Sequence, residues 1–302
     1  MTSQPAAPSA SGSMRLGVVF PQLEIGTVPA DIARYATTVE ALGYRHLLAY
    51  DHVVGGALDE HPELAGRYTS DSMFHEVFVL FGFLAALTTR LELVSGVLIL
   101  PQRQTTLVAK QAAEIDVLSG GRLRVGVGIG WNAIEYEALN ENFRNRARRF
   151  EEQIALLRAL WRENILDFHG DYHTVDHAGI LPMPIQQPIP LWIGASAEPA
   201  VRRAARLGDG YLATTPIGPQ LDAILGWLND ELSRNGRSLE TFGLEGRIGL
   251  AQGNEDDWKR QAAFWREAGA SHLSFNTMGG TYHGVDAHLD ALARAFHAVE
   301  GI

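Results

Sequence analysis

The feature that most constrains this chain is a regular alternation of strand and helix signals along nearly all of its 302 residues. Short apolar segments lead into longer segments whose apolar residues recur at helical spacing. Pro29 begins one such helix and Gly43 ends it, as is typical of helix boundaries. The pattern predicts strands at 15–20, 45–50, 91–99, 122–129, 190–193, 211–213, 244–251 and 272–276. It predicts helices at 29–42, 75–88, 105–118, 150–161, 197–207, 219–234, 255–268 and 286–299.

Eight strand–helix pairs predict an α/β fold, a closed (β/α)8 TIM barrel whose site lies at the carboxyl ends of the strands. An open, doubly wound sheet is the alternative. No linker is long enough to divide the chain, so we expect a single barrel domain over 15–302, preceded by a disordered leader over 1–14. Prolines and glycines interrupt the alternation at 166–188, which predicts an insertion, such as a hairpin.

Composition narrows the class of protein. A hydrophobic fraction of 46% supports a large core, and the absence of cysteine excludes disulfides and thiol chemistry. The net charge of −10 argues against a nucleic-acid partner. No uninterrupted apolar stretch approaches the roughly 20 residues of a transmembrane helix, and no signal peptide is evident. We therefore expect a cytoplasmic protein with no membrane partner that acts on a small molecule.

Several barrel chemistries fit the sequence poorly. The only lysines, Lys110 and Lys259, fall on predicted outer helices, which argues against a Schiff-base enzyme. The first strand has no His-x-His pair, and no Gly-x-Ser-x-Gly elbow occurs. His169, His173 and His177 have the spacing of a metal-binding helix face, but their neighbours favour a hairpin. We therefore predict no metal site there.

The predicted strand at 122–129 runs into three glycines, Gly126, Gly128 and Gly130. Glycine weakens a strand and is useful where something approaches the backbone closely. Their spacing is not that of a Rossmann fingerprint. A strand that loses its side chains at its carboxyl end therefore suggests a flat ligand lying on the strand ends.

Four segments together resemble the luciferase-like monooxygenase superfamily, particularly its deazaflavin (coenzyme F-420) dependent oxidoreductases. They are Ala49-Tyr-Asp-His52, Ser95-Gly-Val-Leu-Ile-Leu-Pro101 with the later Leu118-Ser-Gly-Gly-Arg122, Gly126-Val-Gly-Ile-Gly-Trp-Asn132, and Leu191-Trp-Ile-Gly-Ala-Ser196. The resemblance covers roughly residues 15–275. It implies a barrel with coenzyme F-420 across its mouth and hydride transfer to or from a small molecule. FMN is the alternative cofactor.

The resemblance also implies roles for individual residues. His52 and Asp51 would be catalytic, and a non-proline cis peptide at Gly96-Val97 would lie behind the ring. Trp131 stands where the sugar-phosphate dehydrogenases of the superfamily carry glutamate, which favours an apolar or planar substrate. The implied cofactor-binding residues are Gly96, Val97, Ile99, Gly128, Gly130, Gly194, Ala195 and Ser196. The implied substrate-pocket residues are Phe20, Trp131 and Asn132.

Further expectations concern the surroundings of the site. Gly194 to Ser196 precede a helix, whose free amides suit a phosphate. Arg103 is a second candidate for an anionic cofactor tail. The length and polarity of segment 53–71 predict a lid over the site. The aromatic-rich segment 74–87 suggests a homodimer interface.

Three alternative functions stay open at this level. The first is an FMN-dependent monooxygenase, and the second is a non-catalytic flavin-binding protein. The third is a barrel hydrolase with a metal near His52 or His75.

Overall fold

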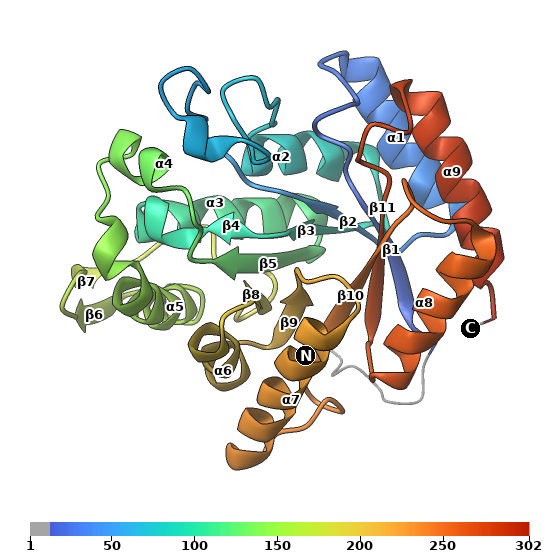
Figure 1. Ribbon diagram of the computed structural model, residues 1–302. Coiled ribbons are helices and arrows are strands. Elements are labelled where there is room, and N and C mark those ends of the chain that lie inside the picture. The colour runs from blue at the N-terminus through green and yellow to red at the C-terminus, as the bar shows by residue number, and fades with distance from the viewer. Residues whose placement is uncertain (1–12, 302) are drawn as a thin grey trace.

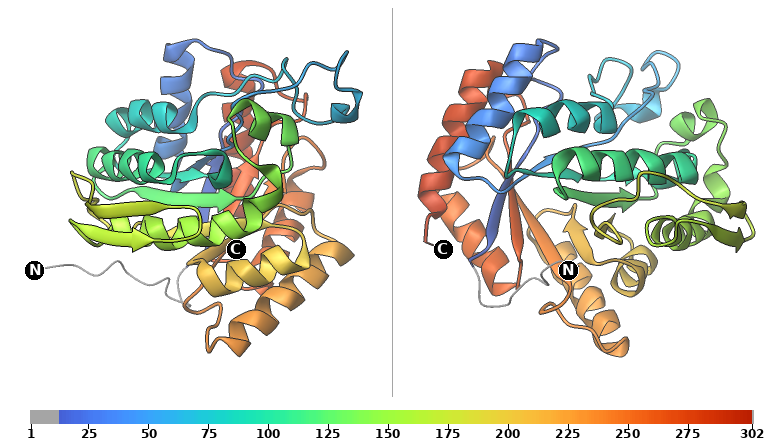
Figure 2. Two further views of the ribbon diagram at one scale, coloured as in Figure 1. Left: turned by 90° about the vertical axis from the view of Figure 1, so that its left-hand side faces the viewer. Right: turned by 180° about the vertical axis from the view of Figure 1, so that it is seen from behind.

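A computed structural model describes residues 13–301, so the leader expected over 1–14 lies almost entirely outside the described residues. Helices surround a twisted parallel sheet, as Figure 1 and the two further views in Figure 2 show. The strands are β1 (Arg15–Val19), β2 (His46–Ala49), β3 (Glu92–Ser95), β4 (Leu98–Ile99), β5 (Leu123–Gly128), β6 (Leu166–His169), β7 (Thr174–Ala178), β8 (Leu191–Ala195), β9 (Gly210–Ala213), β10 (Gly243–Gly249) and β11 (His272–Asn276).

The α-helices follow the expected positions closely. They are α1 (Pro29–Leu42), α2 (Val77–Leu87), α3 (Thr105–Ser119), α4 (Ala133–Ala138), α5 (Arg146–Leu160), α6 (Glu198–Leu207), α7 (Pro219–Arg234), α8 (Glu255–Glu267) and α9 (Gly284–Val299). Short 3-10 turns occur at Pro62–Leu64, Leu100–Gln102 and Phe143–Asn145. The helix α4 is an addition that the apolar spacing did not predict, because six residues are too few to show a helical period.

Strand pairing closes the sheet into a barrel. Within residues 13–301, β1 pairs with β2 and β11, while β5 pairs with β3 and β8, so eight parallel strand positions form a ring. The (β/α)8 prediction is confirmed, and the open-sheet alternative is wrong. The predicted strand at 91–99 is split into β3 and β4, which occupy one position in the ring. A cis peptide between Gly96 and Val97 lies at the split, as the resemblance implied.

The insertion expected at 166–188 contains a two-stranded antiparallel hairpin, β6–β7, outside the barrel. Figure 1 shows this hairpin beside α5. His173 in its turn bonds Glu152 (Nδ1 to Oε1, 2.7 Å) and Thr105 (Nε2 to Oγ1, 2.7 Å), while His169 and His177 are exposed. The three histidines therefore do not converge, and the hairpin interpretation is confirmed.

The barrel interior is filled in layers, as is usual for this fold. Near the amino ends of the strands, Glu245 accepts hydrogen bonds from Arg124 (2.7 Å) and Ser274 and pairs with His46 (3.1 Å). Burial alone would raise the pKa of Glu245, but the charges of His46 and Arg124 outweigh it and hold that pKa well below its usual range. The next layer is apolar and consists of Val19, Leu48, Val94, Trp192, Leu212 and Met278.

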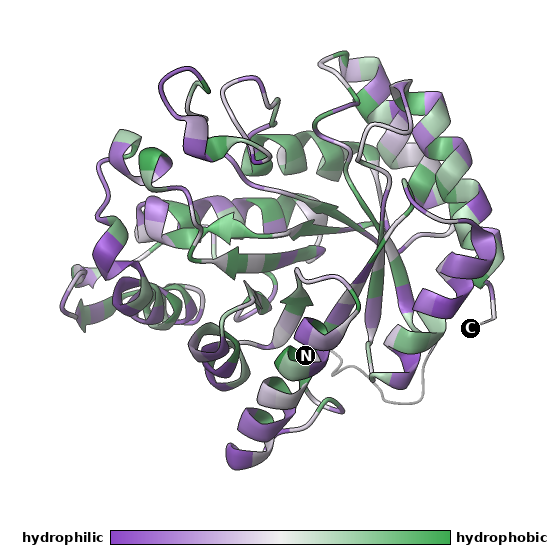
Figure 3. Cartoon of the chain, in the orientation of Figure 1, coloured by the Kyte–Doolittle hydropathy of each residue, from purple (hydrophilic) through white to green (hydrophobic). Residues whose placement is uncertain are grey.

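Apolar surface between the strands and the helices forms the main core. Figure 3 shows hydrophobic residues concentrated on the strands and hydrophilic ones on much of the outer helix surface. Leu47, Leu93 and Leu244, for example, are fully buried there. Within the described residues, no helix is both long and apolar enough to cross a membrane.

Candidate functional site

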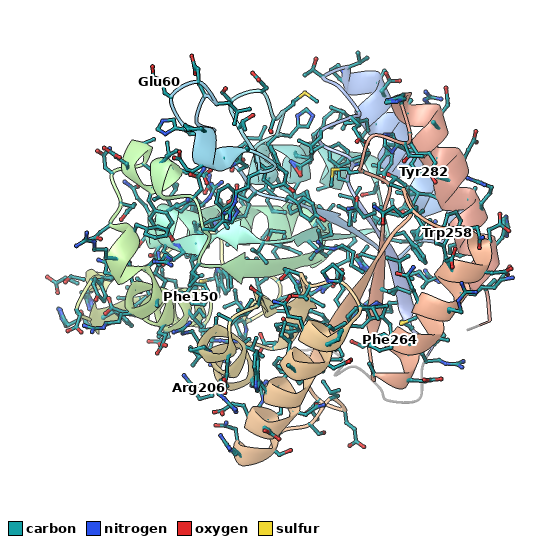
Figure 4. The ribbon with its side chains drawn as sticks, viewed as in Figure 1. Glu60, Phe150, Arg206, Trp258, Phe264 and Tyr282 are labelled. Atoms are coloured by element: carbon teal, nitrogen blue, oxygen red, sulfur yellow. The ribbon has the colours of Figure 1, made fainter. Side chains whose placement is uncertain are left out.

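One cavity of about 490 Å³ opens at the carboxyl ends of the barrel strands. This volume falls within the range of roughly 300–1,000 Å³ that small-molecule sites occupy. The barrel mouth therefore has room for a ligand, as the flat-ligand hypothesis requires. Phe150 of α5, labelled in Figure 4, contributes to the wall. The sequence-predicted residues that line the cavity are Asp51, His52, Gly96, Val97, Ile99, Gly128, Gly130, Trp131, Asn132, Gly194, Ala195 and Ser196.

Phe20 is the exception among the predicted site residues. It is fully buried and packs edge-on against Tyr35 and His75, with ring centroids 5.6 and 5.9 Å away. It does not line the cavity. Assigning Phe20 to the substrate pocket was therefore wrong, because the side chain at the end of β1 turns outward into the core beneath α1.

His52 has the geometry of an oriented imidazole. Its Nδ1 lies 3.2 Å from Oε1 of Glu135, so that the carboxylate fixes one ring nitrogen. Its Nε2 is buried and has no hydrogen-bond partner in residues 13–301, although the residue lines the cavity. Tyr68 and Phe74 pack against the ring, with centroids 5.8 and 5.1 Å away. Within the described residues, Nε2 is therefore left without a partner next to the cavity.

Glu135 is a site residue that sequence reasoning missed. It lies on α4 and accepts hydrogen bonds from the Val53 and Val54 amides and from Gln102. Burial would raise its pKa, but the hydrogen bonds and charge of His52 and the Val53 amide lower it overall. The available signal was the spacing Asn132-x-x-Glu135, which resembles a capping box. Asn132 does cap α4, accepting from the Ile134 amide, whereas Glu135 turns toward His52 instead of the helix start.

Asp51 is held by protein groups on both oxygens. Oδ1 accepts from Arg103 at 2.7 Å, and Oδ2 accepts from the Ile99 amide at 3.0 Å. Burial raises the pKa of Asp51, and the Arg103 charge opposes that rise. Arg103 also pairs with Glu76 and does not line the cavity, so the expectation that Arg103 meets a cofactor tail was wrong. Asp51 thereby ties the end of β2 to the backbone just after the cis peptide.

Val97 fills the space that two glycines leave open. A Cβ on Gly128 would stand 2.6 Å from one Val97 methyl carbon, and a Cβ on Gly194 would stand 2.7 Å from the other. Likewise, a Cβ on Gly130, whose φ is +64°, would stand 2.7 Å from Ile99. The groups that come close to the backbone of these glycines are therefore the side chains of Val97 and Ile99. The expectation that a ligand lies on the bare glycine backbone needs this correction: Val97 and Ile99 lie between.

The start of α6 forms a polar end of the cavity. Gly194, Ala195 and Ser196 lead into this helix, whose first residue is Glu198. Arg203, one turn further along, also lines the cavity and pairs with Glu151. Sequence reasoning missed Arg203 because helical spacing alone does not show which face of α6 meets the barrel mouth. A hydroxyl, helix-start amides and a guanidinium together suit a phosphate.

The segment between β2 and α2 covers one side of the mouth. Tyr68 from this segment lines the cavity, and burial raises its pKa to about 12, so the phenol stays protonated at neutral pH. Arg67 lies over the ring of Trp131, with 4.6 Å between the guanidinium carbon and the ring centroid. Figure 4 labels Glu60 in the same segment. The segment thus has the place expected of a lid.

Metal ions in proteins are usually held by three or more His, Cys, Asp or Glu side chains that lie close together. In residues 13–301, no three His, Asp or Glu side chains gather in such a group. His75, which the hydrolase alternative invoked, lies 3.3 Å (Nε2) from the Gly26 carbonyl oxygen. His52, Asp51 and Glu135 all line the cavity, but His52 pairs with Glu135, and Asp51 is held by Arg103 and the Ile99 amide.

Comparison with known proteins identifies the family. The family model described as luciferase-like monooxygenase matches residues 9–297. The chain belongs to the luciferase-like monooxygenase family. Its closed parallel barrel is the fold expected of that family, and the resemblance drawn from the four sequence segments is confirmed.

Relatives within the luciferase-like family use different cofactors. An F420-dependent glucose-6-phosphate dehydrogenase from Amycolatopsis mediterranei is 31% identical over 212 residues, covering 64% of this chain and 56% of the relative. An FMNH(2)-dependent dimethylsulfone monooxygenase from Pseudomonas putida is 31% identical over 180 residues, covering 57% of this chain and 48% of the relative. These likenesses support an oxidoreductase of the luciferase-like kind and leave the cofactor open between the two.

A solved structure shares the luciferase-like fold of this chain. The structure of an F420-dependent secondary alcohol dehydrogenase in complex with an F420–acetone adduct has a TM-score of 0.77 at 15% identity. It covers 95% of this chain and 99% of the other. The agreement therefore extends over nearly the whole described fold.

Proposed function

We propose that this protein is an oxidoreductase that transfers a hydride between a deazaflavin and a small-molecule substrate. The observation that carries the proposal is the pairing of His52 with Glu135, which leaves the His52 Nε2 free at a cavity that Val97 bounds. A proton donor or acceptor beside the reacting atoms is what reduction or oxidation of a carbonyl, imine or activated double bond requires.

The cavity's residues fit a ring with an anionic tail. Gly96, Val97 and Ile99 would form the wall behind the ring, and Ser196 with Arg203 would hold a phosphate of the tail. When bound, a deazaflavin supplies a hydride donor or acceptor, a two-electron chemistry that no side chain of this protein offers. FMN would fit the same walls and is the alternative, because a relative of comparable identity is FMNH(2)-dependent.

The protein's own residues do the proton work and the positioning. His52 holds a proton at Nε2 or accepts one there, and Glu135 keeps the imidazole oriented through Nδ1. Asp51 supports this geometry from behind by holding the Ile99 amide and Arg103. The segment carrying Tyr68 shields the cavity from water, which strengthens electrostatic interactions inside it.

Titration of the full-length protein with each ring system tests the cofactor. We expect saturable, micromolar or tighter binding of the deazaflavin, seen as a change in its fluorescence and absorbance. Micromolar binding of FMN with no response to the deazaflavin would overturn the cofactor assignment. Binding of neither would overturn the proposed function.

Replacing His52 tests whether the site is catalytic or only binds a flavin. We expect His52→Ala to lower turnover by 10²–10⁴-fold, the usual contribution of a general acid or base, with cofactor affinity retained. The exposed His169 offers the matched control His169→Ala, with turnover unchanged. Equal turnover in His52→Ala and wild type, or none in either, would favour a non-catalytic binding protein.

We also propose that two copies associate through α2 and α3. Both helices expose large apolar side chains, of which Val79 is 73% and Leu107 is 52% exposed. An apolar face of this kind on adjacent helices is typical of a protein–protein contact. A cytoplasmic location stays a prediction from the sequence.

A further inference from the structure

Arg247 is an arginine inside the barrel mouth that the proposed chemistry does not use. It lies on β10, two residues after the inward-facing Glu245, so it points to the same side of the strand and one layer nearer the mouth. It lines the cavity, and its guanidinium carbon lies 5.0 Å from the centre of the Tyr50 ring. Tyr50 follows β2, so Arg247 reaches across the barrel.

Among the described residues, no protein group neutralises the Arg247 guanidinium. In residues 13–301, no carboxylate lies within ion-pairing distance of Arg247, and its buried Nε has no hydrogen-bond partner. Other arginines of the barrel are paired: Arg124 with Glu245 and Glu92, Arg103 with Asp51, and Arg203 with Glu151. Arg247 is half-buried at the cavity wall, so its guanidinium loses part of its hydration, and a cation–π contact offsets about 0.5–2 kcal/mol of that cost. A half-buried guanidinium without a protein carboxylate suits an anion that comes from outside the chain.

The place of Arg247 in the ring of strands indicates which molecule brings that anion. Going round the barrel, β10 lies four positions from β4 in either direction, so Arg247 stands opposite Val97. Ser196 directly follows β8 and Arg203 lies on α6, so this polar end is on a different side of the mouth. If the ring of the proposed cofactor lies against Val97 and its tail lies at Ser196, Arg247 contacts neither. Arg247 is then left to contact the other ligand of the cavity, the substrate.

The available donors indicate the kind of anion. The buried Nε leaves the two terminal nitrogens of Arg247 to meet the cavity, and two parallel N–H donors match the two oxygens of a carboxylate. Tyr50, beside it, lines the cavity with a phenol that burial keeps protonated. One guanidinium balances one negative charge, which suits a carboxylate better than a phosphate dianion.

We propose that Arg247, with Tyr50, is the substrate-recognition site of this protein and selects a substrate that carries a carboxylate. This inference rests on the proposed function, and it narrows the apolar or planar substrate that Trp131 suggested to a planar molecule with an acidic group. His52 would then act on the reducible end of a molecule anchored at its acidic end.

Calorimetric titration with benzoate and with benzamide, its uncharged analogue, tests whether Arg247 binds a carboxylate. The titrations use both the free protein and the cofactor-loaded protein. We expect wild type to bind benzoate at least tenfold more tightly than benzamide. Arg247→Gln should lose that preference, and Arg247→Lys should retain part of it. The control Arg234→Gln changes an exposed arginine of α7 and should bind benzoate as wild type does. Urea unfolding midpoints check that each variant is folded.

The remaining outcomes separate this inference from the proposed function. Arg203→Gln should weaken cofactor binding and leave benzoate binding unchanged. Wild type that does not prefer benzoate, or Arg247→Gln that keeps the preference, would overturn the assignment. So would Arg247→Gln that weakens the cofactor alone, because Arg247 would then serve the ring. If neither cofactor binds while benzoate still depends on Arg247, the proposed function fails and the carboxylate site stands.

Discussion

A Val97 methyl carbon lies 2.6 Å from the point where a Cβ on Gly128 would stand. Real Cβ atoms are essentially never so close to another heavy atom, so a side chain at 128 and the present position of Val97 exclude one another. Val97 is short and β-branched, and it cannot swing away as a long side chain can. The glycine therefore determines where the wall behind the proposed ring stands.

Gly128→Ala is expected to destabilise the fold by about 1–3 kcal/mol, the usual cost of overpacking a well-packed site. It should also weaken cofactor binding, because Val97 must move into the cavity. Urea unfolding and cofactor titration measure the two effects. In the double variant Gly128→Ala/Val97→Ala the contact is relieved. Its loss of unfolding free energy should therefore be smaller than the sum of the losses in the two single variants. Strict additivity would show that the two positions do not compete for space.

Glu135→Gln is expected to change the tautomer of His52. The carboxylate now accepts from Nδ1, which keeps the proton of the neutral ring on Nδ1 and leaves Nε2 as the acceptor. The amide lacks the charge that holds this arrangement, and losing a charged hydrogen bond costs about 1.5–3 kcal/mol. Nitrogen NMR of histidine-labelled protein reports the tautomer. An unchanged His52 signal in the variant would mean that Glu135 does not orient the ring.

The stability of the protein should fall as the pH falls below about 6.5, partly through His272. Burial lowers the pKa of this histidine well below its ordinary value of 6.5, and the charges of Arg124 and His46 lower it further, with Glu245 opposing them. The unfolded chain therefore takes up a proton near pH 6.5 that the folded protein refuses, so stability is complete above that pH and declines below it.

His272→Gln removes that proton uptake. Between pH 7.5 and 5.5, the free energy of unfolding of wild type should fall more steeply than that of the variant, by up to about 1.4 kcal/mol per pH unit. This range lies above the ordinary pKa of 4.5 for Glu245, whose own contribution is lost only under more acidic conditions. Urea unfolding at several pH values gives both curves. Parallel curves for the two proteins would contradict the account.

Arg122→Ala is expected to cost more than about 3 kcal/mol of stability. The Arg122 side chain donates to the Ala85 carbonyl in the last turn of α2 and to the Thr88 and Leu91 carbonyls just after that helix. It also donates to the Ser119 carbonyl. Each of these partly buried acceptors left without a partner costs up to about 1–3 kcal/mol, and the losses do not add fully. Arg45→Ala, at an exposed side chain, is the matched control and should change little. Thermal unfolding compares them.

Val79→Glu should separate the proposed dimer into monomers. The side chain is 73% exposed on α2, so the substitution leaves the fold intact while it places a charge in an apolar contact. Sedimentation velocity should show a dimer for wild type and a monomer for the variant, with Ile165→Glu, at another exposed apolar position, still dimeric. A monomeric wild type would refute the association.

The sequence by itself determined the order of strands and helices, because apolar spacing and helix boundaries such as Gly43 act over a few residues. It also indicated which strand ends surround the cavity that we propose as the site: His52, Val97 and Ser196 all line it. These positions follow from the chain direction in a parallel barrel, where the carboxyl ends of all strands meet on one face.

Only the tertiary structure decided which side chains meet across that face. Glu135 reaches His52 from a six-residue helix too short to leave a pattern, and Arg247 meets Tyr50 from the far side of the barrel. Phe20 turned away into the core, and Gly128 proved to make room for Val97. Such contacts join residues far apart along the chain, and they depend on barrel closure and on side-chain direction, neither of which local spacing encodes.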